Sequence, residues 1–210
     1  MFTADALTFQ EFATQEPLPL ATIQNAVLDF LRGRDDVAVF GAHAVNIYVA
    51  EPRMTQTIDL ISPRAVELIE ELREHLSQRF HVALRVREIG EGRGYRLYQI
   101  QKSGNRHWVD VRPVRELPAT QRIEGVLVIA PADLIANKVI AYHQRRGQPK
   151  SGTDWRDLAM LLLTFPDLKS DPGPVTERLK AANVESAVLG VWRELAAQEI
   201  QPADEDDEFD

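Results

Sequence analysis

Two aspartates in this 210-residue chain have the type and placement that could bind a divalent cation. Asp59 lies in a strand-like segment, residues 57–61, and Asp110 lies in a later one within the sequence HWVDVRP. Because side chains alternate across a strand, carboxylates of two neighbouring strands can converge on one cation. Mg²⁺ prefers such hard oxygen ligands, and phosphoryl transfer commonly uses it. The pattern predicts a metal site, although Asp59 could instead cap the next helix and Asp110 could simply face solvent.

A glycine turn that precedes these strands suits a phosphate group. The apolar segment of residues 37–40 ends at Gly41, and apolar residues then recur at helical spacing from Ala42 onward. A strand that passes through glycine into a helix presents backbone N–H groups and the positive end of the helix to an anion. Gly41 and Ala42 are therefore candidate contacts for a nucleotide phosphate. His43 follows them, but a polar residue at a helix N-terminus accounts for it without a ligand.

A lysine inside a later apolar helix is a second candidate for binding an anion. Lys138 lies in the sequence LIANKVIAYH, and a buried lysine needs either a partner or a ligand phosphate. Asp154 and Asp157 are one helical turn apart, so they share a face and could form salt bridges to Lys138 or Arg145. Both interpretations, a nucleotide contact and a structural ion pair, remain open.

Arg53, ahead of the strand that contains Asp59, has a similar pair of interpretations. Its fork-shaped guanidinium suits either a phosphate or a carboxylate such as that of Asp59.

The five histidines show no HExxH spacing, and the chain has no cysteine, so we expect no zinc site.

Taken together, these motifs resemble those of nucleotidyltransferases of the minimal, AbiEii-type toxin branch. The resemblance covers about residues 37–163, and it depends on the order and spacing of short motifs. In chain order these are Gly41-Ala42, the segment Arg53-Met54-Thr55-Gln56-Thr57-Ile58-Asp59-Leu60, Asp110, Lys138, and the pair Asp154 and Asp157.

The resemblance implies transfer of a nucleotide from an NTP to an RNA or protein acceptor, such as a tRNA end, with Mg²⁺ or Mn²⁺ as cofactor. It implies that Asp59 and Asp110 bind the metal and that they act in catalysis together with Lys138. It also implies a possible antitoxin protein as partner. The nucleotide-binding residues that it implies are Gly41, Ala42, Arg53, Thr55, Thr57, Asp154 and Asp157.

One position departs from the family pattern. Thr57 stands where the family has the first aspartate of its D-x-D motif, and a neutral hydroxyl is a weaker Mg²⁺ ligand than a carboxylate. On this resemblance we expect either a degenerate or regulatory member that binds a nucleotide or a protein, an altered version of an active enzyme, or an enzyme in which another carboxylate compensates.

Composition limits the compartments in which the protein is expected and the partners that it is expected to bind. The formal net charge of −8 argues against binding of duplex DNA, although much of the negative charge lies in the sequence ADEDDEFD at residues 203–210. The N-terminus lacks the basic and apolar regions of a signal peptide, and no apolar run is long enough to span a membrane. We therefore expect a cytoplasmic protein that does not bind membranes.

The hydrophobic pattern predicts an α+β fold with a mixed, nucleotidyltransferase-like sheet flanked by helices and followed by a helical region. The expected divisions are a leader at residues 1–19, an α/β core at 20–130, a helical region at 131–200 and a disordered acidic tail at 201–210. Expected helices are 21–31, 42–49, 63–79, 133–145, 154–163, 174–182 and 185–198. Expected strands are 37–40, 57–61, 81–87, 95–102 and 108–114, with a short pair near 123 and 126–129; GEGRG is expected to be a hairpin turn.

Overall fold

The computed structural model describes residues 18–102 and 104–202. The predicted leader up to residue 17 and the acidic residues 203–210 lie outside this described part. The chain forms two compact units, one from the described residues of Met1–His43 with Met54–Ile129, and one from Ala44–Arg53 with the described residues of Ala130–Asp210. No helix in the described ranges has the length and apolar character needed to cross a membrane.

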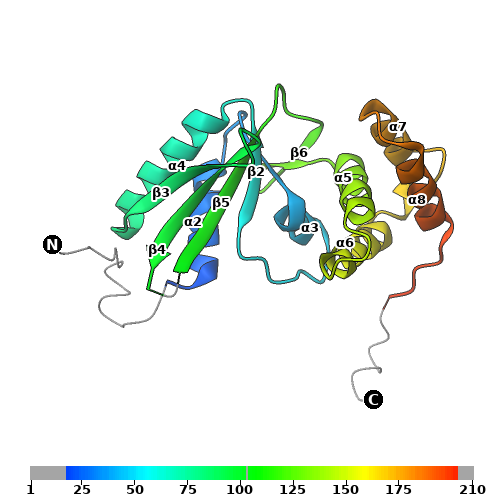
Figure 1. The fold of residues 1–210 in the computed structure, drawn as a ribbon, viewed down its shortest axis with the longest axis horizontal. Coiled ribbons are helices and arrows are strands. Elements are labelled where there is room, and N and C mark those ends of the chain that lie inside the picture. The colour runs from blue at the N-terminus through cyan, green and yellow to red at the C-terminus, as the bar shows by residue number, and fades with distance from the viewer. Residues whose placement is uncertain (1–17, 103, 203–210) are drawn as a thin grey trace, which may run out of the picture. The chain divides into compact units, whose positions relative to one another are not determined.

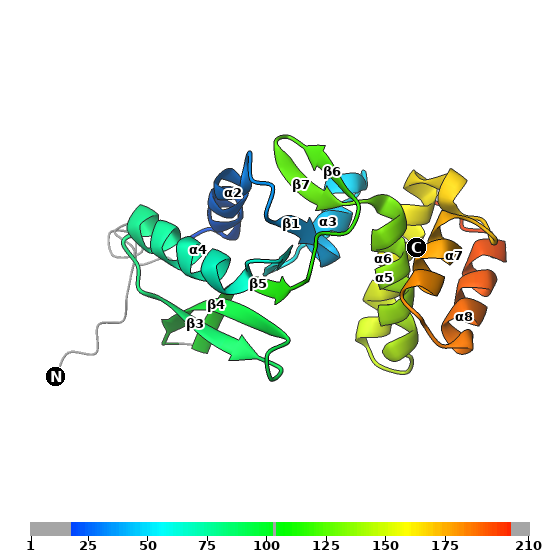
Figure 2. The same ribbon diagram turned by 90° about the horizontal axis from the view of Figure 1, so that it is seen from above.

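The first unit is built on a mixed β-sheet (Figures 1 and 2). In the described part of the chain this sheet has seven strands in the order β3-β4-β5-β2-β1-β7-β6. The pairs β2–β5 and β1–β7 are parallel, and the others are antiparallel. The strands are β1 Ala38–Phe40, β2 Ile58–Ser62, β3 Leu84–Ile89, β4 Gly94–Gln101, β5 Gly104–Pro113, β6 Thr120–Ile123 and β7 Val126–Ile129.

Two helices, α2 (Leu20–Leu31) and α4 (Ala65–Phe80), pack against this sheet and against each other (Figure 2). Their apolar residues recur at helical spacing, so each helix has one buried face. Val109 and Val111 of β5 are buried, and the ring of Trp108 packs edge-on against Phe80 of α4 at 5.8 Å. Trp108 is the extra residue of a β-bulge opposite β4, because Leu97 pairs with Val109 while the next residue, Tyr98, pairs with His107.

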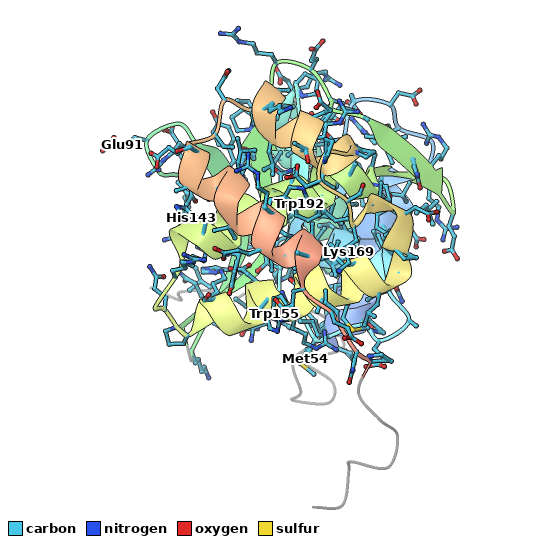
Figure 3. All side chains as sticks on the ribbon, turned by 90° about the vertical axis from the view of Figure 1, so that its right-hand side faces the viewer. Met54, Glu91, His143, Trp155, Lys169 and Trp192 are labelled. Atoms are coloured by element: carbon cyan, nitrogen blue, oxygen red, sulfur yellow. The ribbon has the colours of Figure 1, made fainter. Side chains whose placement is uncertain are left out.

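The second unit is helical. Its helices are α5 Pro131–Gln144, α6 Lys150–Thr164, α7 Pro174–Ala181 and α8 Ser186–Ala197, with a 3₁₀ turn at Pro166–Leu168. Trp192, labelled in Figure 3, is fully buried and donates a hydrogen bond from Nε1 to Thr176 Oγ1 at 3.1 Å, which joins α8 to α7. Helix α3 (Gly41–Tyr48) follows β1 directly, and its residues from Ala44 onward belong to this unit.

The predicted fold class is confirmed, as are the GEGRG hairpin turn and the order of helices and strands. Three boundaries were wrong by three or more residues. β3 begins at Leu84 rather than His81, because His81 has φ of 53° and ends α4 as its left-handed cap. β5 begins at Gly104, since it pairs with β4 along its length. α6 begins at Lys150 because Gly152 does not interrupt it, the helix penalty of about 1 kcal/mol for glycine being small.

The β6–β7 hairpin offers a test of the local backbone. Its two-residue turn, Glu124-Gly125, has φ of +48° and +85°, a combination that favours asparagine over glutamate at the first position. Glu124→Asn should raise the free energy of unfolding by about 0.5–1 kcal/mol. Glu124→Gln, which removes the same charge without the left-handed preference, should leave it nearly unchanged. Urea unfolding measures both, and equal effects would contradict the explanation.

Candidate active site

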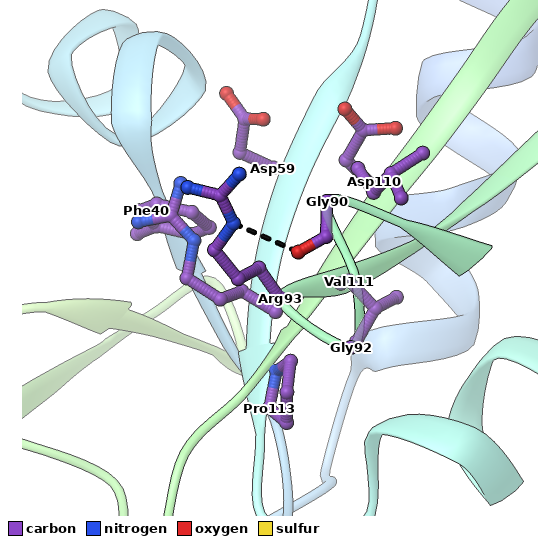
Figure 4. A pocket seen from close by; sticks show the side chains of 11 residues that line it. Phe40, Asp59, Gly90, Gly92, Arg93, Asp110, Val111 and Pro113 are labelled. Carbon is purple, nitrogen blue, oxygen red and sulfur yellow. Dashed lines mark hydrogen bonds between the residues drawn. The ribbon is translucent and has the colours of Figure 1, made fainter.

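The two candidate metal ligands are brought side by side in the first unit. Asp59 of β2 and Asp110 of β5 are direct register partners on neighbouring parallel strands. Their neighbours Leu60, Val109 and Val111 are buried, so the two aspartates project from the opposite face of the sheet. Figure 4 shows both carboxylates on the same side of these strands. Neighbouring strands are about 4.8 Å apart, which is close enough for two carboxylates to share one cation.

The glycine turn lies against one of these carboxylates. Gly41 has φ of +67°, and a Cβ at this position would lie 2.6 Å from Asp59 Oδ2. Any other residue at 41 would therefore displace the carboxylate in addition to straining the backbone. The turn, predicted to contact a nucleotide phosphate, and the aspartate, predicted to bind a metal ion, are thus adjacent, with Ala42 next in the first turn of α3.

His43 and Thr55 are held by hydrogen bonds within the protein. His43 Nδ1 lies 3.1 Å from Thr55 Oγ1, and the backbone oxygen of Thr55 accepts a hydrogen bond from Gln24 Nε2 at 2.7 Å. Both residues are buried, and burial lowers the pKa of His43, so its ring is neutral near pH 7. These contacts fix the start of α3 against the segment that leads into β2.

A cleft of about 660 Å³ opens over the two aspartates. Its walls include Phe40 and the β3–β4 turn, and Figure 4 shows Arg93 of this turn donating from Nε to Gly90 O at 2.8 Å. Arg112 also lines the cleft, and its guanidinium carbon lies 4.8 Å from the centre of the Phe40 ring. The cleft therefore combines two carboxylates with exposed guanidinium groups, which suits a bound metal ion together with phosphate oxygens.

Asp110 already has a cationic partner. Arg96 of β4 donates from Nε to Asp110 Oδ1 at 2.7 Å and from Nη2 to Oδ2 at 2.6 Å. The hydrogen bond to Asp110, followed by the charges of Asp110 and Asp59, raises the pKa of Arg96 despite some burial. The guanidinium thus belongs to the electrostatic environment of both aspartates.

The residues fit one divalent cation rather than two. Asp59 and Asp110 supply carboxylate oxygens at one side of an open cleft, whereas half-buried Thr57, just before β2, offers only a hydroxyl. Within the described ranges, no group of three or more His, Cys, Asp or Glu side chains could hold a metal ion. Mg²⁺ is commonly held by one or two carboxylates together with substrate phosphates and water, and this donor set matches that pattern.

The remaining predicted residues form a cluster of ion pairs in the second unit. Asp157 is completely buried and accepts hydrogen bonds from Arg53 Nε at 2.7 Å, from Arg53 Nη2 at 2.9 Å and from Lys138 Nζ at 2.6 Å. Asp154, also buried, accepts from Arg145 Nη1 at 2.8 Å and lies 3.8 Å from Lys138 Nζ. The salt-bridge interpretation that the sequence left open is thus realised in the structure for Asp154, Asp157 and Lys138.

Electrostatics explain why this cluster stays charged. Burial opposes ionisation of the Asp157 carboxyl, but the hydrogen bonds from Arg53 and the charge of Lys138 outweigh it and hold its pKa below the usual value. The backbone of Arg53 is held in place by the side chain of Asn46, which accepts a hydrogen bond from Arg53 N at 3.0 Å and donates one to Arg53 O at 2.6 Å. The nucleotide contacts suggested for this cluster stay a prediction.

Sequence reasoning missed the arginines of the cleft and its aromatic wall. Arg93, Arg96, Arg112 and Phe40 were not singled out, although arginine is frequent between residues 85 and 115. That density was the available signal. It did not identify individual residues, since the antiparallel register of β4 and β5 decides which arginine meets Asp110.

Several solved structures have a fold similar to that of this chain. The Megavirus polyadenylate synthase matches with a TM-score of 0.57 and 16% identity over 70% of this chain, which spans only 31% of that protein. JHP933 from Helicobacter pylori matches with a TM-score of 0.51 and 13% identity, over 91% of this chain and 93% of that one. The antibiotic-resistance factor ANT(2'')-Ia matches with a TM-score of 0.50 and 14% identity, over 83% and 94%. At these identities the likeness shows a nucleotidyltransferase-like fold.

The family follows from the sequence model that the chain matches. Residues 26–207 match the family described as "Nucleotidyl transferase AbiEii toxin, Type IV TA system". The chain belongs to this AbiEii nucleotidyltransferase toxin family, as the motifs of its sequence indicated. No curated protein matches it.

The buried cluster generates a prediction for stability. Asp157→Asn leaves the charges of Lys138 and Arg53 without their buried partner and should cost about 3–5 kcal/mol of unfolding free energy. Glu194→Gln is the control, because Glu194 is 75% exposed and pairs with Arg146 only at 3.6 Å, and it should cost less than about 1 kcal/mol. Chemical unfolding at pH 7 measures both, and similar costs would contradict a structural role for the cluster.

The stability difference between wild type and Asp157→Asn should depend on pH. The pKa of Asp157 is lowered in the folded protein, so its contribution is complete above the value of about 3.9 typical of an unfolded chain. That contribution is lost as the pH falls through the lower, folded value. The difference in unfolding free energy between wild type and Asp157→Asn should therefore be constant from pH 7 to about 5 and should shrink below about pH 4.

Proposed function

We propose that this chain is a metal-dependent nucleotidyltransferase of the toxin type that transfers a nucleotide from an NTP to an RNA or protein acceptor. The observation that carries the proposal is the pairing of Asp59 with Asp110 at one register position, at the base of a cleft that also presents Arg93 and Arg112. Membership of the AbiEii family supports this chemistry, and it makes a cognate antitoxin a reasonable partner.

In this proposal Asp59 and Asp110 hold Mg²⁺ or Mn²⁺. When bound, the ion would draw negative charge from the phosphate under attack. Arg93 and Arg112 contact phosphate oxygens from the cleft wall, where guanidinium forks suit them. Gly41 keeps the backbone close to the Asp59 carboxylate, and the N–H groups of Gly41 and Ala42 offer hydrogen bonds to the triphosphate.

The transfer assay uses each labelled NTP with Mg²⁺ or Mn²⁺ and with tRNA or total protein as acceptor. Asp59→Ala should lower transfer by roughly a hundredfold, the scale seen when one electrostatic contact to a transition state is lost. Thr57→Asp should raise it about tenfold, because it restores a carboxylate two residues before Asp59.

A charge control separates this effect from a general change in the first unit. Glu74 of α4 is exposed and lies on the helix that packs against the other face of the sheet, so Glu74→Ala should leave transfer unchanged. Absence of transfer by wild type, Asp59→Ala and Thr57→Asp alike would sink the catalytic proposal.

A second candidate is a catalytically silent module that binds a nucleotide or a partner protein. Two observations favour it, namely the hydroxyl of Thr57 in place of a carboxylate and the engagement of both Asp110 oxygens by Arg96. This candidate predicts calorimetric binding of an NTP by wild type without transfer. Transfer by wild type would exclude it.

A further inference from the structure

Arg96 occupies the carboxylate that the proposed metal site needs. The residue faces Asp110 across the antiparallel β4–β5 ladder, and its two hydrogen bonds of 2.7 and 2.6 Å engage both carboxylate oxygens. Bidentate, charge-assisted pairs of this kind are among the stronger hydrogen-bonded contacts in proteins. The side chains of Arg96 and Asp110 are 25% and 19% exposed, so solvent weakens the pair only in part.

The charges at the site lead to a definite expectation for cations. Asp59 and Asp110 alone would carry a charge of −2, and Arg96 reduces the sum of the three groups to −1. A guanidinium has no lone pair to offer a metal ion and repels it. The hydroxyl of Thr57 provides no compensating charge. Each of these features lowers the affinity of the cleft for a divalent cation.

We propose that Arg96 is a built-in counter-ion of Asp110 that competes with the divalent cation for this carboxylate, so the protein without nucleotide binds the cation weakly. The inference rests on the proposed function in that Asp59 and Asp110 are taken as the cation ligands. It makes Arg96 a positioning residue that sets cation affinity, and the cation binds only when the guanidinium leaves Asp110.

The charge of Arg96, rather than its volume, is the quantity to vary. Arg96→Gln keeps a shorter hydrogen-bonding side chain and removes the charge, whereas Arg96→Lys keeps the charge. Two unit charges about 4 Å apart interact strongly enough near a protein surface to change a binding constant by roughly five- to a thousandfold. Arg96→Gln should therefore bind Mn²⁺ at least about tenfold more tightly than wild type, and Arg96→Lys should stay within about threefold of it.

A neighbouring arginine provides the matched control. Arg87 of β3 pairs with Arg96 in the β3–β4 ladder, but it is exposed and lies over the Tyr98 ring at 5.5 Å. Arg87→Gln removes the same charge from the same sheet and should change Mn²⁺ affinity by less than about threefold, since exposed charges are well screened. Adding Asp110→Asn to Arg96→Gln should abolish the gain, because the competition is for Asp110.

The experiment is a titration of the full chain with Mn²⁺ alone, without nucleotide, in which electron paramagnetic resonance reports the free ion. Arg96→Thr serves as a second neutral variant that suits a strand, should Arg96→Gln not fold. The proposal is overturned if neutral variants bind Mn²⁺ no better than wild type, if Arg87→Gln produces an equal gain, or if the gain persists without Asp110. Because no NTP or acceptor is present, the result is independent of the transfer assay, and the two proposals can fail separately.

Discussion

The candidate site depends on the register of two parallel strands. A shift of one residue between β2 and β5 would move either Asp59 or Asp110 out of alignment and onto the opposite face, since side chains alternate along a strand. The register is held by apolar burial, with Ile58, Leu60 and Val109 all fully buried. The Trp108 bulge turns one further large side chain toward α4. The packing of the core on one face thus determines which polar residues meet on the other.

Arginine–aspartate pairs occur in both units, but burial gives them different consequences. Asp157 is inaccessible to solvent and receives hydrogen bonds from two cationic side chains, so its charge has no alternative partner. Asp110 retains 19% exposure and lines a cleft that a ligand can enter. The first arrangement fixes local structure, because loss of one partner leaves a buried charge. The second leaves the Asp110 carboxylate accessible from the cleft.

The amount of structure that could be predicted from the sequence follows from the range of the interactions involved. Apolar periodicity located the helices and strands, since each depends on residues within a few positions. It failed at His81, where the backbone conformation that ends α4 outweighs strand propensity. The positions of Asp59 and Asp110 were predictable as a pair on neighbouring strands. Which arginine faces Asp110 was not, because that contact depends on a ladder between β4 and β5 and on the bulge within it.

Lys138 illustrates the same limit from the other direction. A lysine within an apolar helix requires a counter-charge, and this could be stated from the sequence alone. The sequence alone could not identify the residue that supplies this counter-charge. Asp157 lies 19 residues after Lys138, and it also pairs with Arg53, which is 104 residues away from it. Local sequence therefore predicts that a buried charge needs a partner more readily than it predicts which residue that partner is.

Thr57 and Arg96 alter the same property of the site by different chemistry. The family motif that the sequence resembles implies a carboxylate at position 57, where threonine carries no charge, and Arg96 neutralises the charge of Asp110. The fold tolerates both because neither residue belongs to the apolar face that sets strand register. Family membership is shown despite both residues, whereas cation affinity is expected to depend on them. Differences in catalytic capacity within such a fold can thus arise from a few charges at the cleft while the core remains the same.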